Sequence, residues 1–366
     1  MKKRFLLGPL ALSAMLATGC SHVAPDPATS QAQIVEAAKR EGKVVVYSVL
    51  SNKAAAPLVN DFKSLYPDIK VEYDGESGSN ETNERYKTEV AAGKESADVM
   101  WSSSMDLQMK LVADGYALPY RSPEAAKLPS WAVYRDLAYG TTYEPVVIVY
   151  NKAQVSADEV PKDRAALARL LTSQPEKYRG KVATFDVEKS GVGFMFAVQD
   201  RKHDPDADRL LAAFGATDLR TSPGTGAVIT KVNTGEFLLG YNIMGAYALS
   251  RSRKDLPGMG VVIPQDYTVV LSRVMFISKH AKHPNAAKLW SDYMLSARGQ
   301  KVLGDALELF AIRDDVDAQY TAAKLNQELG GRAKPIPLNM EITEYLEPQK
   351  SQEFVARWRA AQRGNR

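Results

Sequence analysis

Residues 43–62 read KVVVYSVLSNKAAAPLVNDF, and this stretch decides the fold. Its β-branched beginning, Lys43–Ser48, has the length and composition of a buried parallel strand. A polar turn follows at residues 51–53, and apolar residues then recur at helical spacing until Tyr66-Pro67 stops the helix. The alternating strand Ile69–Tyr73 completes a βαβ unit. This unit predicts an open α/β sheet, and such sheets bind ligands beyond the carboxyl ends of their strands.

The turn after the first strand is the first candidate ligand site. Ser51, Asn52 and Lys53 bring hydroxyl, amide and ammonium groups to the start of a helix, where the first N–H groups have no partner within the helix. Together these groups suit an anion. An ordinary βα turn is the alternative interpretation, and the turn by itself does not separate the two.

The first 19 residues predict export. Lys2, Lys3 and Arg4 precede an apolar run, Phe5–Ala17, that is too short to span a bilayer. Leu16-Ala17-Thr18-Gly19-Cys20 resembles a bacterial lipoprotein box in which Cys20 is lipidated, although the leucine lies one place further upstream than usual. Plain secretion with cleavage nearby is the alternative. The expected location is the periplasm of a Gram-negative bacterium, with contact to the membrane only through a lipid anchor at Cys20.

Composition narrows the class further. The chain has 366 residues, of which 45% are apolar, so it is long enough for two lobes. Cys20 is the only cysteine, so no disulfide forms within the chain. The export segment holds three of the 47 Lys and Arg residues and none of the 43 Asp and Glu residues. Without it the chain is nearly neutral, and a nucleic-acid-binding function loses its support.

Strands and helices alternate in two blocks, between which the chain crosses twice. The first crossing is expected near residues 140–145, and the β-forming run Thr268–Ser278 carries the chain back. This pattern describes an α/β protein with two lobes, a hinge and a cleft that closes on a small ligand. The expected parts are a signal segment (residues 1–19), a lipid-anchored or free tether (20–40), a first lobe (41–145 plus 270–325), a second lobe (146–269) and a C-terminal helical tail (326–366).

Several segments resemble one family, the extracytoplasmic solute-binding proteins of ABC importers, and within it the ferric-iron, hexose-phosphate and phosphonate group. The resemblance covers roughly residues 40 to 310 in matching order. It implies a type II periplasmic binding protein fold, with two mixed sheets flanked by helices and an interlobe cleft, and an ABC permease in the inner membrane as partner. The segments that carry it are Gly42–Ser48, Ala97–Ser104, Lys231–Glu236, Lys282–Leu289 and Asp292–Gln300.

The same resemblance offers a test for iron. Ferric-binding members place two adjacent tyrosines after a strand of the second lobe, because phenolate oxygens suit a hard cation. Here Ile243 and Met244 stand at about that place. The turn after the first strand holds no histidine, and Lys53 would repel a cation. Ferric-iron binding is therefore the alternative to an organic anion, and no metal or cofactor is expected.

The segments that match the family's ligand loops suit a small anionic solute, phosphorylated or a phosphonate. Ser190-Gly191 opens a helix whose N–H groups could hold a phosphate, and Ser222 and its neighbours open another helix in the same way. For each of these turns, a simple helix cap is the alternative interpretation. Arg273 interrupts a β-patterned run and either faces solvent or clamps an anion. Glu76 could bind hydroxyl groups or an ammonium group of the solute. The same two roles are open for Asp266. The expected ligand-binding residues are Ser51, Asn52, Lys53, Glu76, Ser77, Ser102, Ser103, Thr142, Ser190, Gly191, Ser222, Asn242, Tyr247, Asp266 and Arg273.

An enzyme is not expected. The four histidines, His22, His203, His280 and His283, follow no metal-site spacing, and neither a Gly-x-Ser-x-Gly elbow nor a Walker loop is present. The expected protein is a monomer that captures its solute, closes and docks on the permease without chemistry. Presentation of the ligand to a membrane sensor kinase is the alternative role.

Overall fold

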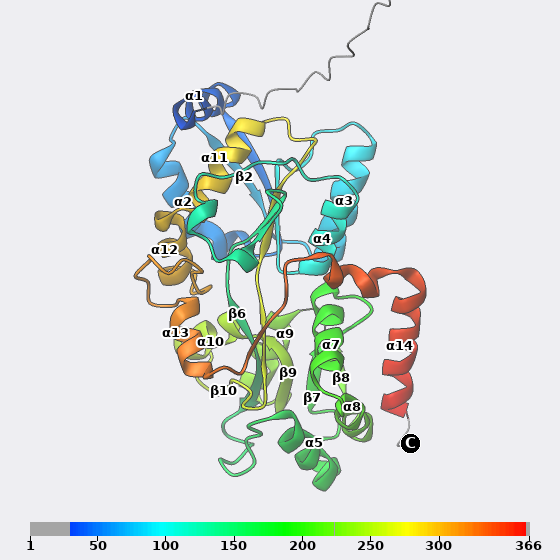
Figure 1. The fold of residues 1–366 in the computed structure, drawn as a ribbon. Coiled ribbons are helices and arrows are strands. Elements are labelled where there is room, and N and C mark those ends of the chain that lie inside the picture. The colour runs from blue at the N-terminus through cyan, green and yellow to red at the C-terminus, as the bar shows by residue number, and fades with distance from the viewer. Residues whose placement is uncertain (1–29, 223, 364–366) are drawn as a thin grey trace, which may run out of the picture.

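The computed structural model describes residues 30–222 and 224–363, which form two lobes one above the other (Figure 1). The predicted signal segment and Cys20 lie outside the described residues. Within the described part of the chain, no helix combines the length and the apolar character needed to cross a bilayer.

The first lobe is built on a six-stranded mixed sheet with the order β2-β1-β3-β12-β5-β4. Strands β1, β2 and β3 are parallel, as the β-branched run at residues 43–48 predicts, while β12 lies antiparallel between β3 and β5. The βαβ prediction is confirmed. The strands are β1 (Lys43–Ser48), β2 (Lys70–Asp74), β3 (Val99–Ser102), β4 (Val133–Tyr134), β5 (Ala138–Gly140) and β12 (Val274–Ile277).

Helices cover both faces of this sheet, with α3 and α4 on one side and α2, α11 and α12 on the other (Figure 1). Helix α2 ends before Pro67 as predicted, but it begins at Asn52 directly after the Ser51 cap, so part of the expected turn is helical and Pro57 lies inside the helix. The helices are α1 (Gln31–Glu41), α2 (Asn52–Leu65), α3 (Ser79–Ala91), α4 (Met105–Ala113), α11 (Pro284–Leu295) and α12 (Ala297–Asp305), with short 3₁₀ turns at Ala125–Lys127 and Ser130–Ala132.

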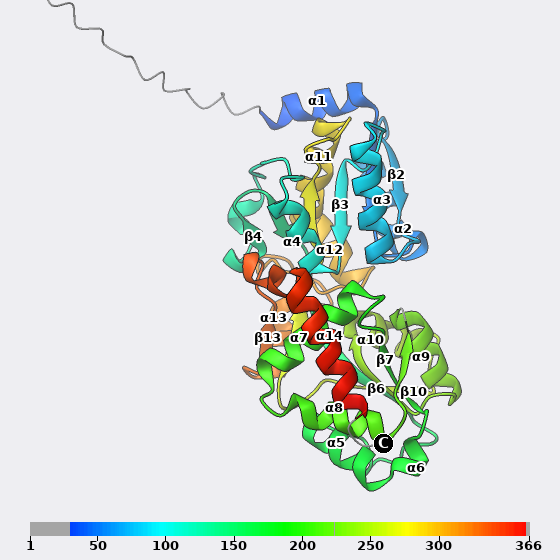
Figure 2. The ribbon, with the colours of Figure 1, turned by 90° about the vertical axis from the view of Figure 1, so that its right-hand side faces the viewer.

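Helix α1 corrects the predicted tether of residues 20–40. From Gln31 onward the chain is helical and packs against α11 at the end of the first lobe (Figures 1 and 2). Ser30 and Gln33 form a capping box at its start, and Gly42 adopts φ 67° at its end. Because Ile34 and Ala38 are buried against the lobe, residues 31–40 belong to the first lobe.

The second lobe has a seven-stranded mixed sheet with the order β13-β11-β6-β9-β7-β8, and β10 pairs with β6 beside β11. The predicted architecture of two mixed sheets flanked by helices is therefore confirmed. The elements are β6 (Glu144–Asn151), α5 (Arg164–Ser173), α6 (Pro175–Tyr178), β7 (Val182–Phe185), α7 (Gly191–His203), α8 (Ala207–Ala216), β8 (Arg220–Ser222), α9 (Thr225–Thr234), β9 (Leu239–Met244), α10 (Gly245–Lys254), β10 (Met259–Val262) and β11 (Thr268–Leu271).

Two short segments form the hinge between the sheets. Residues 141–143 join β5 to β6, and residues 272–273 divide the run Thr268–Ser278 into β11 in one sheet and β12 in the other. The segments are hydrogen-bonded to each other, since Thr141 N donates to Arg273 O at 2.9 Å and Thr142 N donates to Ser272 Oγ at 3.3 Å. The two crossings therefore lie side by side.

The C-terminal tail contacts both lobes. Strand β13 extends the second sheet beside β11, the 3₁₀ turn η3 packs on α4 of the first lobe, and α14 returns to pack on α8 (Figure 2). Trp358 is buried, and the ring of Phe354 lies 5.2 Å from that of Phe194. The tail elements are α13 (Ala322–Leu329), β13 (Ala333–Pro335), η3 (Met340–Leu346) and α14 (Pro348–Arg363).

Candidate functional site

A pocket of about 320 Å³ lies between the lobes and is called the cleft pocket here. Residues of the first lobe, the second lobe and the hinge line it, and seven of the expected ligand-binding residues are among them. The lining residues are Val49, Leu50, Ser51, Gly75, Glu76, Ser77, Gly78, Ser79, Ser103, Phe185, Ser190, Val192, Gly224, Thr225, Gly226, Met244, Tyr247 and Arg273.

The first turns of five helices meet at this pocket. Their N-cap residues all line it: Ser51 before α2, Gly78 before α3, Ser190 before α7, Gly224 before α9 and Met244 before α10. The side chains of Ser51 and Ser190 accept hydrogen bonds from their own helices, whereas α3, α9 and α10 have no side-chain cap. Uncapped first turns present N–H donors and the positive end of the helix dipole to the pocket.

On the first-lobe side, hydroxyl groups and one carboxylate face the pocket. Ser51, Ser77 and Ser103 line it as expected. Glu76 also lines it, and its Oε1 accepts a hydrogen bond of 2.8 Å from Asn52 N. Asn52 itself accepts from Gly75 N at 3.0 Å, so it supports the loop and does not line the pocket. Lys53 is exposed on α2, outside the lining.

Two other expected residues, Ser102 and Ser222, have local structural partners. Ser102 Oγ accepts from Ser104 N at 3.2 Å at the end of β3. Ser222 Oγ donates to Gly224 O at 3.2 Å at the end of β8. Neither serine lines the cleft pocket, since both side chains are used to shape the turn that leads into the next helix.

Gly191 lies at a contact between the lobes. A Cβ atom at this position would lie 2.7 Å from Leu107 Cδ1 and 3.0 Å from Asn80 Oδ1, both in the first lobe. Asn80 Nδ2 also donates to Lys189 O at 3.2 Å across the same boundary. The start of α7 therefore touches the first lobe directly, and a side chain at this position would require Leu107 and Asn80 to shift.

Arg273 is neither exposed nor an unpaired clamp. It is 3% exposed, lines the cleft pocket, and donates from Nε and Nη2 to the two oxygens of Glu144 at 2.9 and 3.3 Å. Thr142 completes the group, because its Oγ1 donates to Glu144 at 2.8 Å and accepts from Arg273 N at 2.9 Å. Thr142 is thus a hinge residue, and the charge of Arg273 is compensated within the protein.

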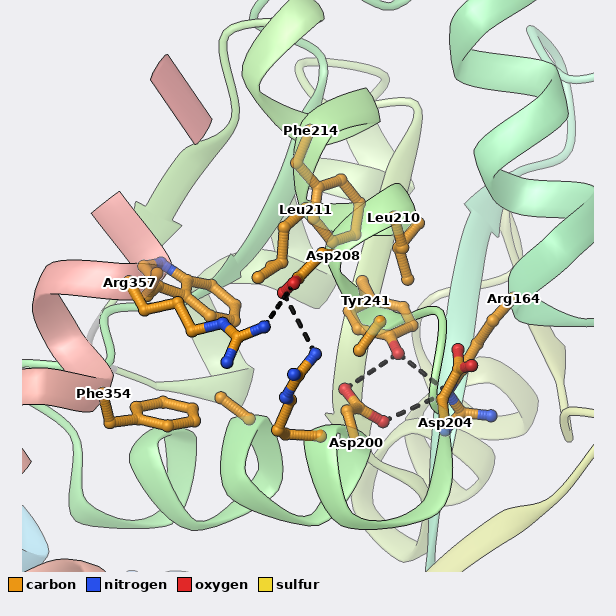
Figure 3. Close-up of a pocket in the computed structure, with 14 residues that line it drawn as sticks. Arg164, Asp200, Asp204, Asp208, Leu210, Leu211, Phe214, Tyr241, Phe354 and Arg357 are labelled. Atoms are coloured by element: carbon orange, nitrogen blue, oxygen red, sulfur yellow. Dashed lines mark hydrogen bonds and ion pairs between the residues drawn. The ribbon is translucent and has the colours of Figure 1, made fainter. Parts of the chain in front are cut away.

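Asn242 and Asp266 belong to a polar network inside the second lobe, away from the cleft pocket, in which Asn242 is buried and Asp266 lies at the exposed edge. Figure 3 shows its centre, where Arg164 donates to Asp200 at 3.1 Å and to the hydroxyl of Tyr241 at 2.8 Å. Asn242 donates to Asp200 at 2.6 Å, and Asp266 accepts from Arg164 at 2.9 Å. Burial raises the pKa of Tyr241 well above its ordinary value, so its phenol donates as a neutral group. Asn242 also adopts φ 56°, which turns β9 toward the cleft residues that follow.

Thr225 was not among the expected residues, although it lines the cleft pocket at the first position of α9. Its Oγ1 is buried and has no hydrogen-bond partner among the described residues. Ser79 lies in the equivalent position of α3 and also lines the pocket. Both hydroxyls follow a glycine N-cap directly, and this local pattern was the signal that could have identified them.

The positions tested for iron carry few hard donors. Ile243 is buried in the core of the second lobe, while Met244 lines the cleft pocket. Tyr247 lines the pocket as expected, and its hydroxyl accepts from Arg251 at 3.2 Å. In the described ranges, no group of three or more His, Cys, Asp or Glu side chains is arranged to hold a metal ion.

Comparison with known proteins agrees with this architecture. The family model described as "Bacterial extracellular solute-binding protein" matches residues 48–301. The substrate-binding protein of an ABC transporter from Agrobacterium tumefaciens is 34% identical, with a TM-score of 0.83 over 88% of this chain and 94% of that chain. No curated protein sequence matches the chain.

More distant structures share the fold alone. The periplasmic binding protein AfuA from Actinobacillus pleuropneumoniae, solved with fructose-6-phosphate, is 17% identical, with a TM-score of 0.69 over 87% of this chain and 97% of that chain. A ferric-binding protein from Campylobacter jejuni is 18% identical, with a TM-score of 0.66 over 87% of this chain and 99% of that chain. One fold thus carries a sugar phosphate in one neighbour and ferric iron in another.

Proposed function

The chain belongs to the bacterial extracellular solute-binding proteins and is the solute-binding component of an ABC transporter, and from this premise we propose that it captures a small anionic solute, phosphorylated or a phosphonate, in the cleft pocket. Proteins of this family bind small solutes outside the cytoplasm and work with a membrane permease; they are not a class of enzymes.

The convergence of five helix N-termini supports an anionic solute. Two of these helices belong to the first lobe and three to the second, so N–H donors approach the pocket from both sides. A phosphoryl or phosphonyl group has three oxygens and can accept from several helices at once. Burial of such a group between the lobes strengthens these hydrogen bonds, since water is excluded on closure.

The unpartnered hydroxyl of Thr225 supports the same assignment. A buried hydroxyl without a partner costs about 1–3 kcal/mol, and a ligand oxygen would remove this cost. The remainder of the solute would lie toward Glu76, Ser77 and Ser103, which offer one carboxylate and two hydroxyls. These groups suit a hydroxylated or amino-bearing body. The volume of about 320 Å³ is appropriate for a small metabolite.

Ferric-iron binding is the alternative. The helix N-termini disfavour a cation, and Tyr247 and Glu76 are the anionic-type oxygen donors that line the pocket. Two protein donors fall short of the coordination that a ferric ion takes, so iron would need an accompanying anion to complete it. For this reason the organic anion is the preferred ligand class.

The proposal places the protein in the periplasm of a Gram-negative bacterium as a monomer, held to the membrane through Cys20. A sensor kinase that reads the closed lobes is the alternative partner to the permease. Mass spectrometry of the intact protein from its native host would detect the lipid as an added mass on an N-terminal Cys20.

The ligand class can be tested by titrating the mature protein with inorganic phosphate, sugar phosphates, phosphonates, phosphoglycerate, carboxylates and ferric citrate in a calorimeter and in thermal unfolding. A ligand present at about 100 times its Kd should stabilise the protein by about 2.7 kcal/mol. We expect a phosphorylated or phosphonate compound to do so. A coloured tyrosinate complex with ferric citrate, with no response to any of the organic anions, would overturn the proposal.

Thr225→Val tests the position of the anion in the cleft pocket. It removes the unpartnered hydroxyl and keeps the shape of the side chain, so the fold should be retained. Loss of one hydrogen bond to a charged ligand should weaken binding by roughly tenfold or more. Unchanged affinity in Thr225→Val would place the anion elsewhere.

A further inference from the structure

A second pocket, called the tail pocket here, lies on the other side of the start of α7 from the cleft pocket. It has a volume of about 510 Å³, and Ser190 lines both pockets, so the first turn of α7 separates them. Asn80 and Asp106 come from the first lobe, Glu188 and Phe194 from the second, and Ala356 and Arg359 from α14. Three parts of the chain therefore meet around one space, near where the tail crosses between the lobes (Figure 2).

The charge of this pocket is not balanced. Glu188 is paired with Arg359, whose Nε donates to it at 2.9 Å. Asp106 is 2% exposed, and its Oδ1 accepts a hydrogen bond of 2.8 Å from Leu107 N. No cationic side chain of the described residues forms an ion pair with it. These three are the charged side chains of the lining, so one buried carboxyl remains uncompensated.

Burial raises the pKa of Asp106 to about 7, although backbone N–H groups of Leu107 and Asp106 lower it. Above that pH the group becomes a carboxylate in a poorly solvated position. A charge in such a position is stabilised by a partner of opposite sign. The remaining wall contains Leu107, Phe194 and Val355, which suit an apolar body.

We infer that the tail pocket is a binding site for a small organic monocation, with its ammonium group on Asp106 and its apolar body against α7 and α14. A divalent metal ion does not fit, because a single carboxylate of the lining is uncompensated and metal ions need several oxygen ligands. An anion does not fit, because Asp106 would repel it. The site is separate from the cleft pocket and does not depend on the identity of the transported solute.

The consequence for function follows from the lining. A cation in the tail pocket would contact both lobes and the tail at once, so its affinity depends on how the lobes are arranged. By linkage, binding of the cation would change the affinity of the cleft pocket for its solute by the same factor by which the solute changes the affinity of the tail pocket for the cation. The protein would then respond to a second compound that it does not carry.

The test titrates the whole mature protein with benzylammonium at about pH 8. NMR spectroscopy of the protein and calorimetry measure the binding. Benzyl alcohol has the same apolar body without the charge and serves as the matched ligand. We expect benzylammonium to bind more tightly than benzyl alcohol, and to bind more weakly at about pH 5, where Asp106 is protonated. Asp106→Asn should weaken benzylammonium binding by roughly tenfold or more.

Two further variants keep the outcome clear. Asp114→Asn makes the same chemical change at the exposed end of α4 and should leave the affinity for benzylammonium unchanged. Ala356→Trp adds a large side chain to the wall that α14 contributes to the tail pocket, leaves Asp106 itself unchanged, and should abolish binding. The inference is overturned if the folded protein shows no response to millimolar benzylammonium at about pH 8. It is also overturned if Asp106→Asn and Ala356→Trp bind as the unmodified protein does, or if binding depends on Glu76 instead.

Discussion

Arg273 and Glu144 join the two hinge segments through a buried ion pair, in which Nε and Nη2 of the arginine donate to the two carboxylate oxygens at 2.9 and 3.3 Å. They stand 129 residues apart in the chain, at the start of β6 and just before β12. Glu144 is 0% exposed, and Arg273 also lines the cleft pocket. The same ion pair thus joins the two stretches of chain that connect the lobes. It also compensates the charge of Arg273 at one wall of the cleft pocket.

Glu144→Gln should therefore lower stability and raise anion affinity together. Removal of one partner leaves Arg273 charged and buried, which costs about 3–5 kcal/mol in the free energy of unfolding. The uncompensated guanidinium would then attract an anion in the cleft pocket. Chemical denaturation and calorimetry with the best anionic ligand measure the two effects. Glu176→Gln, which breaks an exposed pair with Arg179, should change stability by less than about 1 kcal/mol. A Glu144→Gln protein as stable as the parent would contradict the hinge assignment.

Gly191→Ala should weaken solute binding without unfolding either lobe. The added methyl would meet Leu107 and Asn80 across the lobe boundary, so the lobes could not approach as closely. We expect a loss of affinity of several fold, a larger loss for Gly191→Val, and an increased radius of gyration of the ligand-bound protein in small-angle scattering.

Gly193→Ala, two residues further along α7, is the contrasting variant. Its Cβ would lie 2.3 Å from Phe185 Cβ in the same lobe, so this change should lower the melting temperature. If Gly191→Ala lowered the melting temperature as much as Gly193→Ala, the contact at Gly191 would not be specific to the lobe arrangement.

Glu308→Gln should loosen a second contact between the lobes. Glu308 follows α12 in the first lobe and pairs with Lys254 at 2.5 Å and with Arg253, both at the end of α10 in the second lobe. Burial acts to raise the pKa of Glu308, but hydrogen bonds from Lys254 and Arg253 outweigh it and lower the pKa. The stabilisation is therefore present above the ordinary glutamate range and is lost as the pH falls through the lowered pKa.

Small-angle scattering of the ligand-free protein against pH measures this effect. The parent protein should expand on acidification, and Glu308→Gln should already be expanded at neutral pH and lack the acid step. Asp305→Asn, which breaks an exposed pair on α12, should behave as the parent does. A Glu308→Gln protein that retains the acid step would assign the expansion to other carboxyl groups.

Asp106→Asn should stabilise the ligand-free protein in a pH-dependent way. The pKa of Asp106 is about 7 in the folded protein and near 3.8 in the unfolded chain, so the folded protein binds more protons between these values. Its contribution to stability therefore decreases as the pH rises through this window. The variant should gain up to about 4 kcal/mol at pH 8 and almost nothing near pH 4. Thermal unfolding against pH measures the gain, and a gain that is equal at both pH values would contradict the burial of an ionisable carboxyl.

Local patterns predicted many of the elements and seven of the residues that line the cleft pocket. The run Lys43–Ser48 and the spacing in α2 are properties of neighbouring residues, so β1 and α2 have the predicted bounds to within a residue or two. The N-caps Ser51 and Ser190 are equally local, and both line the cleft pocket.

Long-range partners could not be predicted in this way. Asn242 is held by Asp200, and Asp266 is held by Arg164, which lies 102 residues away in the chain. The spacing of residues in one segment carries no information about such a partner, since only the folded lobe brings the two together. The tail was expected as a helical segment, but its contacts with α4 and α8 were not, because that surface is assembled from separate parts of the chain.

The position of β12 has a consequence for how the protein is made. This strand, near residue 275, is inserted between β3 and β5, which are complete before residue 141. The sheet made first by the ribosome is therefore left with a gap until more than a hundred further residues have been added. Strands β6, β7, β8 and β9 are neighbours in the second sheet and lie in one continuous stretch of the chain, so this part of the second lobe can pair before β12 completes the first sheet. An export pathway that delivers the chain from its N-terminus onward would meet an unfinished first lobe for most of the passage.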